Sequence, residues 1–425
     1  MGVVRNQSAL RQLRQSNVER VLALLRAGGP RSRAEIGELT GLSRTTLSGI
    51  VGGLLEDGVL VEGPEPRPSG GRGRPVQRLS LNPRSAQAIG IEIGRERIYA
   101  VLADAAHEVT ASGGRTCPAR ADVRTRARAA ADAVRELAEE GGIDLGAVAG
   151  IGLGTPGPGE TAEHGGRTRA GAAERRAAPR SRQALADLVS EELGAPVLAD
   201  NNSRLTALGE AVWGAAAGAA DVLHVALSYG VGGGLVVDGR LFRGSSGAAG
   251  EIGHICVDAQ GPACWCGGRG CLERYASLPA VLRAAGRRSR DRLQEAVAAG
   301  EDRACAAVEQ AGAAVGRALA AACTTVNPER IVLGGEVAAL GPRLLDPARE
   351  AFRAYSAPLV HRGIGLTPAQ LDDRGGALGG LALVLRESPL LAGYADPAAA
   401  QMGAPTGASA GTSPQEPPSP EARSR

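Results

Sequence analysis

Four side chains that commonly bind metal ions lie close together in the second half of the sequence. Three cysteines belong to the run Cys264-Trp265-Cys266-Gly267-Gly268-Arg269-Gly270-Cys271, and His254 precedes this run by ten residues. Three thiolates and one imidazole complete the tetrahedral coordination that Zn²⁺ prefers, and the glycines allow the loop to turn tightly around the ion. Because no coordination position remains for water, the pattern predicts a structural zinc site, with zinc as the cofactor.

The other four cysteines are Cys117, Cys256, Cys305 and Cys323. We expect them to be buried as small hydrophobic side chains. Cys256 is an alternative metal ligand, although its place two residues after His254 fits packing better. The odd total of seven cysteines, three of them crowded into eight positions, favours metal binding over disulfides in a long chain.

A polar segment beginning at residue 43 carries side chains that could contact DNA bases. It follows a capping-box pattern at residues 32–35 and a tight turn at residues 40–42, and its apolar positions keep helical spacing up to residue 55. This arrangement predicts a helix-turn-helix, in which the start of the second helix meets base edges. The short hydroxyl donors and the guanidinium that lie off the apolar face are Ser43, Arg44, Thr45, Thr46 and Ser48.

The next segment predicts the wing of a winged helix. Residues 59–62 and 76–81 have the pattern of strands, and the loop between them carries Arg72 and Arg74 in a narrow cationic stretch suited to a minor groove. Residues 1–84 contain thirteen arginines and seven acidic residues, although the net charge of the whole chain is only +3. We therefore predict that this segment binds double-stranded DNA; the alternative is a small module for protein contact.

Composition excludes several other classes of function. All 48 basic residues of the 425-residue chain are arginine, so no lysine can form a Schiff base or clamp a phosphate. The N-terminal segment lacks the apolar core of a signal peptide, and no uncharged apolar run reaches the roughly 20 residues of a membrane span. We expect a cytoplasmic protein without a membrane partner, built from two or three domains.

The elements that must position these residues follow an alternating α/β order after residue 88. Predicted strands at 89–93, 98–104, 148–153, 196–199, 222–228, 234–237 and 331–333 alternate with helices at 121–140, up to 193, at 204–217 and up to 326. Glycine-rich turns are expected at 152–159, 230–234 and 334–335. Residues 159–182 have the composition of a mobile loop, and residues after 387 that of a disordered tail.

Several of these motifs together resemble the ROK family, named for repressors, open reading frames and kinases. They are Ala249-Gly250-Glu251-Ile252-Gly253-His254, the cysteine run closing in Cys271-Leu272-Glu273, a Gly-Pro-Gly-Pro-like turn and the turn at Gly232-Gly233-Gly234. The resemblance spans roughly residues 16–385 and implies an actin-like, two-lobed ribonuclease-H-type fold with a sugar cleft, assembled as a homodimer or homotetramer. The domains we predict are a winged helix-turn-helix at 1–84, ROK lobe 1 at 85–200, ROK lobe 2 with the zinc loop at 201–387, its last helix returning to lobe 1, and a tail at 388–425.

The resemblance also implies that kinase chemistry has been lost. The family's sugar-site pattern, Asn-Asp followed by a helix ending in Leu-Gly-Glu, falls on residues 201–210, and it places Asn202 where an aspartate takes the proton from the sugar. An amide cannot accept that proton, and losing a general base typically costs about 10²- to 10⁴-fold in rate. Asp200 should project elsewhere, and the two phosphate turns have drifted to Glu92-Ile93-Gly94-Arg95-Glu96 and Ser228-Tyr229-Gly230. No catalytic residue is therefore assigned.

Sugar recognition fits the family pattern better. The positions that match its sugar contacts are Asn201, Asn202, Glu251, His254 and Glu273, and His254 would also bind zinc. The resemblance thus implies a sugar-responsive DNA-binding regulator, a repressor reading a pseudo-palindromic operator, whose effector is a small sugar or sugar phosphate. Two alternatives stay open: an ATP-dependent sugar kinase with a fused DNA-binding domain, and a regulator with an inert cleft that responds to a protein partner.

Overall fold

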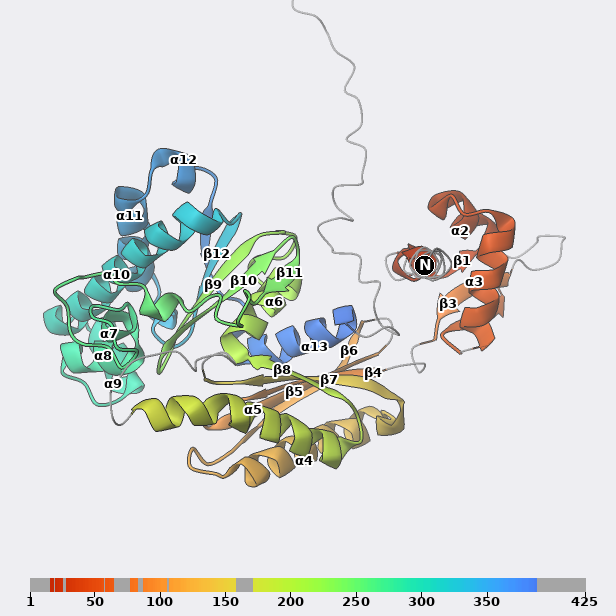
Figure 1. The fold of residues 1–425 in the computed structure, drawn as a ribbon, viewed down its shortest axis with the longest axis horizontal. Helices are drawn as coiled ribbons and strands as arrows, with labels where there is room; N and C mark the ends of the chain where they lie inside the picture. The colour runs from red at the N-terminus through yellow and green to blue at the C-terminus, as the bar shows by residue number, and fades with distance from the viewer. Residues whose placement is uncertain are drawn as a thin grey trace, which may run out of the picture.

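A small N-terminal unit and a larger two-lobed body follow one another along the chain (Figure 1). The computed structural model describes residues 16–18, 20–25, 28–56, 58–64, 77–82, 87–104, 107–157 and 171–387. The predicted wing-tip residues Arg72 and Arg74 and the predicted tail at 388–425 lie outside this part of the chain. None of the described helices is long and apolar enough to cross a membrane.

The described part of the N-terminal unit has two helices joined by a short turn and a small antiparallel sheet. Its elements are β1 (Arg31–Ser32), α2 (Arg33–Thr40), α3 (Arg44–Glu56), β2 (Leu60–Pro64) and β3 (Gln77–Leu81). The capping box forms as expected, since the Ser32 hydroxyl accepts from the Glu35 amide and the Glu35 carboxylate accepts from the Ser32 amide at 2.7 Å. Gly41, with φ of 66°, ends α2 in the left-handed conformation that glycine tolerates best. The short strand β1, which was not predicted, pairs with β3.

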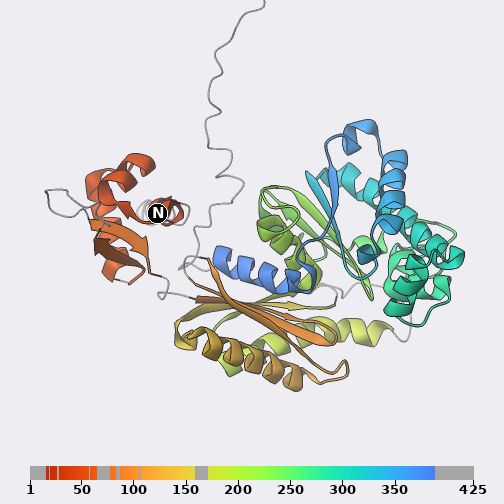
Figure 2. The ribbon, with the colours of Figure 1, turned by 180° about the vertical axis from the view of Figure 1, so that it is seen from behind.

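The first lobe is a five-stranded mixed sheet with two helices on one face (Figure 2). Its strand order is β6-β5-β4-β7-β8, formed by β4 (Gln87–Ile93), β5 (Arg97–Asp104), β6 (Val109–Thr116), β7 (Val148–Thr155) and β8 (Val197–Asn201). Helices α4 (Val123–Gly141) and α5 (Gly171–Leu193) bury a cluster of Ile, Leu, Val and Ala side chains against it. Strand β6 was missed because this polar edge strand has no buried residue.

One loop expectation was wrong in this lobe. Residues 159–182 have the glycine and arginine content of a mobile loop, but α5 already begins at Gly171. Alanine and arginine are both strong helix formers, so the composition from 171 onward is compatible with a helix that continues into the predicted one. Residues 158–170 lie outside the described part of the chain.

The second lobe repeats this layered plan. Its sheet has the order β11-β10-β9-β12-β13. The strands are β9 (Val222–Leu227), β10 (Val231–Val237), β11 (Arg240–Phe242), β12 (Arg330–Gly334) and β13 (Gly365–Pro368). Helices α6 (Asn202–Trp213), α7 (Glu273–Ala276), α8 (Leu278–Ala285), α9 (Arg290–Ala298), α10 (Asp302–Val326), α11 (Pro342–Tyr355) and α12 (Pro358–His361) complete it. The largest apolar cluster lies between the sheet and α10, and α6 covers the opposite face.

Helix α13 (Gly375–Glu387) joins the two lobes by contributing to the apolar clusters of both. Glycines allow the close approach: a Cβ at Gly90 would lie 1.9 Å from the Ala377 carbonyl, and one at Gly152 would lie 2.0 Å from the Gly380 carbonyl. With aromatic side chains at only 2% of the sequence, the layers are held together by small side chains at short distance. The expected α/β fold with a two-lobed body is confirmed.

Candidate functional site

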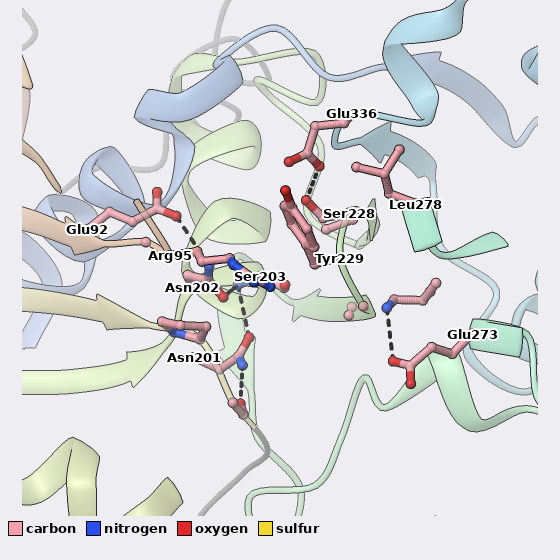
Figure 3. A pocket seen from close by; sticks show the side chains of 18 of the residues that line it. Glu92, Arg95, Asn201, Asn202, Ser203, Ser228, Tyr229, Glu273, Leu278 and Glu336 are labelled. Carbon is pink, nitrogen blue, oxygen red and sulfur yellow. Dashed lines mark hydrogen bonds between the residues drawn. The ribbon is translucent and has the colours of Figure 1, made fainter. Parts of the chain in front are cut away.

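A cleft of about 610 Å³ lies where the two lobes face each other (Figure 3). One wall comes from the ends of β4, β7 and β8, and the other from the β9–β10 turn, the cysteine-rich loop and the start of α7. The five side chains predicted to contact a sugar all line this cleft: Asn201, Asn202, Glu251, His254 and Glu273. Residues far apart in the sequence are therefore brought together at one place.

The four predicted metal ligands form a compact cluster at one side of the cleft. The ligand atoms of His254, Cys264, Cys266 and Cys271 all lie within 4.8 Å of one another. The Cys266 and Cys271 sulfurs are 3.6 Å apart, and the Cys264 sulfur is 3.8 Å from Nδ1 of His254. Tetrahedral Zn–S bonds of about 2.3 Å place two sulfurs about 3.8 Å apart, so the donor set and its spacing fit a four-coordinate ion.

The loop geometry explains how these ligands converge. Cys256 pairs with Cys271, and Ala263 pairs with Arg269, in isolated antiparallel bridges. Gly270 has φ of 61°, and a Cβ there would lie 1.6 Å from the Asp258 carbonyl, so this turn requires glycine. Desolvation by burial raises the pKa of the Cys264 thiol, and the same cause acts on Cys271.

Two expectations about the remaining cysteines have different outcomes. Cys117, Cys305 and Cys323 are buried, as predicted. Cys256 is exposed and stands outside the ligand cluster, so neither burial nor its role as an alternative ligand is correct. Its backbone pairs with that of Cys271, but its side chain is not among the atoms that converge on the cluster.

The two carboxylates at the metal side of the cleft differ in their partners. Oε2 of Glu273 accepts a hydrogen bond from the Val231 amide at 3.1 Å, and Oε1 accepts a short one from the indole of Trp265 (Figure 3 shows the first). Glu251 is exposed to the cleft. His254 presents Nδ1 to Cys264 and packs edge-on against Trp265, with ring centroids 4.6 Å apart. This end therefore combines an oriented carboxylate, an exposed one and an imidazole.

Asn201 has a structural duty as well as a place in the cleft. Its side-chain oxygen caps α6 by accepting from the Ser203 and Arg204 amides, and its side-chain nitrogen donates to the Gly157 carbonyl. It thereby fixes the start of α6 and the turn after β7. The carbonyl and the amide of this side chain are both engaged.

The glycine run at 232–234 was expected to be a turn but lies within strand β10. The turn itself falls at Tyr229 and Gly230. The glycines serve close packing instead: a Cβ at Gly234 would lie 2.6 Å from the Ala207 Cβ, and one at Gly233 would lie 2.5 Å from the Gly250 carbonyl. Only glycine lets α6 and the loop before Glu251 approach this strand.

At the opposite end of the cleft, Asn202 faces a carboxylate. Its side-chain amide donates to Oε1 of Glu92 at 3.2 Å (Figure 3). The Gly376 amide donates to Oε2 of Glu92 at 3.0 Å. Desolvation by burial raises the pKa of Glu92 to about 7, against the lowering effect of these two hydrogen bonds. An aspartate at position 202 would place a second carboxylate beside Glu92, a like-charge contact that an amide avoids.

The two turns that stand where the family resemblance predicts phosphate-binding turns, at residues 92–96 and 228–230, contact each other across the cleft. The Arg95 guanidinium lies over the Tyr229 ring, 4.4 Å from its centroid, and connects the first lobe to the second. The Ser228 hydroxyl makes a short hydrogen bond to Glu336, which follows β12 (Figure 3). Protein side chains thus occupy and pair within the end of the cleft where a phosphate turn was expected.

Asp200 projects away from this cleft, as expected. Its carboxylate is buried and forms ion pairs with Arg204 at 2.9 Å and Arg243 at 2.6 Å. Asp200 does not line the cleft. Its carboxylate is therefore not presented to the cleft beside Asn202. Glu210 ends the Leu-Gly-Glu part of the predicted sugar-site pattern. It is fully buried and accepts hydrogen bonds from three backbone amides, so it holds these backbone segments together.

The predicted DNA-contacting residues of α3 lie on its outer face. Ser43, Arg44, Thr45, Thr46 and Ser48 are exposed, whereas the apolar positions of α3 are buried. The Ser43 hydroxyl accepts from the Thr46 amide at 3.2 Å and so caps the helix. The other four side chains remain on the free face.

Trp265 and Glu336 are among the cleft residues that the sequence did not single out. The available signal for Trp265 was its place between two predicted ligands, Cys264 and Cys266. Glu336 follows Gly334 and Gly335 at the end of β12, where a chain leaving a central strand emerges at the cleft edge. Neither position has a spacing that distinguishes it before the fold is known.

Known proteins resemble this chain over most of its length. The xylose repressor of Caldicellulosiruptor bescii is 27% identical over 374 residues, covering 84% of this chain and 92% of the repressor. The glucokinase of Halalkalibacterium halodurans is 36% identical over 223 residues, covering 48% of this chain and 68% of the glucokinase. A crystal structure of a ROK family transcriptional regulator, a homologue of the Escherichia coli MLC protein, shares the fold with a TM-score of 0.71 and 24% identity, covering 90% of this chain and 97% of that one. Because the ROK family model matches residues 88–387, well over half of the sequence, the protein belongs to the ROK family.

Proposed function

We propose that the protein is a sugar-responsive, DNA-binding transcriptional repressor of carbohydrate metabolism genes that acts in the cytoplasm. One observation carries this proposal. The match to the xylose repressor covers a larger share of the chain than residues 88–387 occupy, and the segment after Glu387 is too short to supply the difference. The similarity therefore includes part of the N-terminal unit, whereas the glucokinase match covers less of the chain than the ROK segment alone.

The N-terminal unit supplies the DNA contacts in this proposal. The exposed hydroxyls of Thr45, Thr46 and Ser48 and the Arg44 guanidinium would meet base edges and phosphates at the start of α3. Arg72 and Arg74 would enter the minor groove from the wing. A homodimer or homotetramer would present two such units to the two halves of a pseudo-palindromic operator.

The cleft would bind the sugar, and zinc would hold its shape. Zinc on His254 and the three cysteines fixes the loop that carries Trp265 and leads into Glu273. When bound, the ion provides a structural cross-link and takes no part in chemistry. The carboxylates of Glu251 and Glu273 would accept from sugar hydroxyls, and a site built this way penalises ligands that lack one of them.

Sugar binding can reach the operator because the cleft lies between the lobes. Asn201 and Asn202 belong to one wall, and Glu251 and Glu273 to the other, so one ligand touching both would favour a closed arrangement. The effect on DNA affinity can be no larger than the sugar's differential affinity for the two arrangements.

Sugar kinase activity is absent in this proposal. The support is the Asn202–Glu92 pair where a base is needed, together with the Arg95–Tyr229 and Ser228–Glu336 contacts where phosphate would enter. ATP consumption with a hexose by the purified protein would contradict it and establish the kinase alternative.

The proposal is tested by fluorescence anisotropy of labelled DNA from upstream of the protein's own gene, at fixed salt, with a panel of sugars and sugar phosphates. We expect specific binding that one ligand shifts. The logarithm of the DNA affinity falls as the logarithm of the salt concentration rises, and Arg44→Ala should make this slope less steep by about 1. Arg292→Ala, which removes an ion-paired arginine on α9, is the matched control and should leave the slope unchanged.

Two results would contradict the proposal. An unchanged slope for Arg44→Ala would remove this residue from the interface. Specific DNA binding that is indifferent to every ligand would favour an inert cleft regulated by a protein partner.

A further inference from the structure

Trp265 occupies an unusual position for a large aromatic side chain. It is one of only two tryptophans in the chain and lies between two predicted metal ligands, Cys264 and Cys266. The exposed fraction of its surface is 39%. Its side chain lines the cleft. Because both neighbours are directed toward the ligand cluster, the Trp265 backbone is held in place and its ring is presented to the cleft.

Aromatic side chains are concentrated in this cleft beyond what composition predicts. Phe, Trp and Tyr make up only 2% of the sequence, yet Tyr99, Tyr229 and Trp265 all line the same cavity. Tyr229 is covered on one face by Arg95. Trp265 contacts His254, which is predicted to bind both metal and sugar. It also contacts Glu273, which is predicted to bind sugar.

The contacts of Trp265 orient the carboxylate of Glu273. The indole N–H donates to Oε1, while the Val231 amide donates to Oε2 at 3.1 Å, so each oxygen holds one protein hydrogen bond. A carboxylate has about four acceptor positions, and two therefore stay available to a ligand. The direction of those two positions is set by Trp265 on one side and by strand β10 on the other.

We propose that Trp265 is a positioning and specificity-determining residue for the effector, and that the effector is a neutral pyranose. The inference rests on the proposed function. The indole ring offers an apolar surface to the C–H face of the sugar ring, and its N–H holds Glu273 ready to accept two hydroxyls. A ligand without a ring face, or one whose hydroxyls point elsewhere, loses both contacts.

The charges around Trp265 select against a phosphorylated sugar. Two carboxylates, Glu251 and Glu273, face this end of the cleft. Of the four arginines that line the cleft, three already have partners: Arg204 pairs with Asp200, Arg97 pairs with Asp373, and Arg95 stacks on Tyr229. The fourth, Arg290, begins α9. A phosphate would meet like charge near Glu273, whereas a neutral sugar would not.

The first experiment uses the zinc-loaded full-length Trp213→Phe variant, in which Trp265 is the only tryptophan. Neutral pyranoses, their 6-phosphates and open-chain polyols are titrated while tryptophan emission and melting temperature are recorded. We expect one pyranose to change the emission saturably and to raise the melting temperature at the same concentrations, with its phosphate and polyol at least about tenfold weaker.

The outcomes separate the two proposals. A ligand that raises the melting temperature without changing the emission overturns the role of Trp265 and leaves sugar binding intact. Tighter binding of the phosphate than of the parent sugar overturns the neutral-pyranose assignment. No shift in melting temperature with any ligand overturns the proposed sugar response, and this inference with it.

A second experiment separates the contribution of the Trp265 ring face from that of its N–H donor. Trp265→Phe keeps a ring but loses the N–H donor, and we expect about tenfold weaker binding; Trp265→Ala loses both, and we expect about 100-fold. Both variants should keep a full equivalent of zinc, because Trp265 is not a ligand. Trp265→Ala should also lose the preference for the pyranose over the polyol. Unchanged affinity and preference in Trp265→Ala, or loss of zinc in Trp265→Phe, would overturn the proposal.

Discussion

The two ends of the interlobe cleft are built on opposite principles. At the metal end, the loop around the cysteines fixes Glu273 and His254, and Glu251 stays exposed to the cavity. At the other end, side chains from the drifted turns pair with one another, as Arg95 does with Tyr229. The difference shows that one part of the cleft keeps oriented acceptor groups open to the cavity, whereas in the other part the side chains are engaged with one another.

Removing the metal should have the largest effect on this comparison. Cys266→Ser opens the ligand cluster, and we expect the proposed sugar affinity to fall by at least about 100-fold and the lobe to lose several kcal/mol of stability, because structural zinc contributes directly to folding. Metal content, calorimetric unfolding and sugar titration measure this. Cys256→Ser is the matched control, since that exposed thiol stands outside the cluster. Equal behaviour of the two variants would refute the metal site.

Glu92 should give the other end of the cleft a distinct pH dependence. Its pKa in the folded protein is raised by burial from 4.5 to about 7, so the folded state holds a proton that the unfolded chain has released between these values. The contribution of Glu92 to stability is therefore greatest below about pH 4.5 and is lost as the pH rises to about 7, by up to about 3 kcal/mol.

Denaturant unfolding of Glu92→Gln against the unmodified protein across this range measures that contribution. We expect the substitution to remove it. Asn202→Asp should steepen the loss of stability, because a second carboxylate then faces Glu92. A Glu92→Gln profile parallel to that of the unmodified protein would show that Glu92 ionises normally.

Carboxylates at the two ends should respond differently to loss of charge. Glu251→Gln at the metal end should weaken the proposed sugar binding about tenfold to 100-fold, because hydrogen bonds to charged acceptors contribute about 1.5–3 kcal/mol. Glu336→Gln at the other end should change it less than twofold, since its partner is Ser228. Isothermal titration calorimetry compares them, and equal losses would mean that the ligand spans the whole cleft.

The smallest expected effect concerns the contact between Arg95 and Tyr229. Tyr229→Ala removes a cation–π interaction that is worth about 0.5–1 kcal/mol at an exposed site. The melting temperature should fall slightly, and the sugar affinity should stay within about twofold. Tyr229→Phe keeps the ring face and serves as the control. A large loss of sugar affinity in Tyr229→Ala would place the ligand at this end of the cleft instead.

The metal cluster could be predicted because its information is local. Three of its ligands lie in one short run, and thiolate chemistry is so restricted that spacing alone indicates the site. The position of Cys256 could not be predicted in the same way, because it lies only two residues after His254 and the spacing does not say which of the two side chains joins the cluster. In the structure, His254 joins the cluster and Cys256 is exposed.

Glycines show where local patterns mislead. The run at 232–234 has the composition of a turn, and nothing in its immediate neighbours distinguishes a turn from a strand crowded by other elements. The crowding comes from Ala207 and Gly250, which belong to other segments of the chain than β10. The start of helix α5 shows a second case. The glycine and arginine content of residues 159–182 predicted a loop, but the alanines from Gly171 onward support a helix.

The sequence by itself determined the alternating α/β order of most elements, the capping box before α2 and the grouping of His254 with three cysteines. These depend on periodicity, short spacings and the chemistry of single side chains. Only the tertiary structure decided that Asn202 faces Glu92, that Arg95 covers Tyr229 and that Trp265 orients Glu273. Such pairs join separate loops or lobes, and contacts between surfaces brought together by folding leave no periodic trace along the chain.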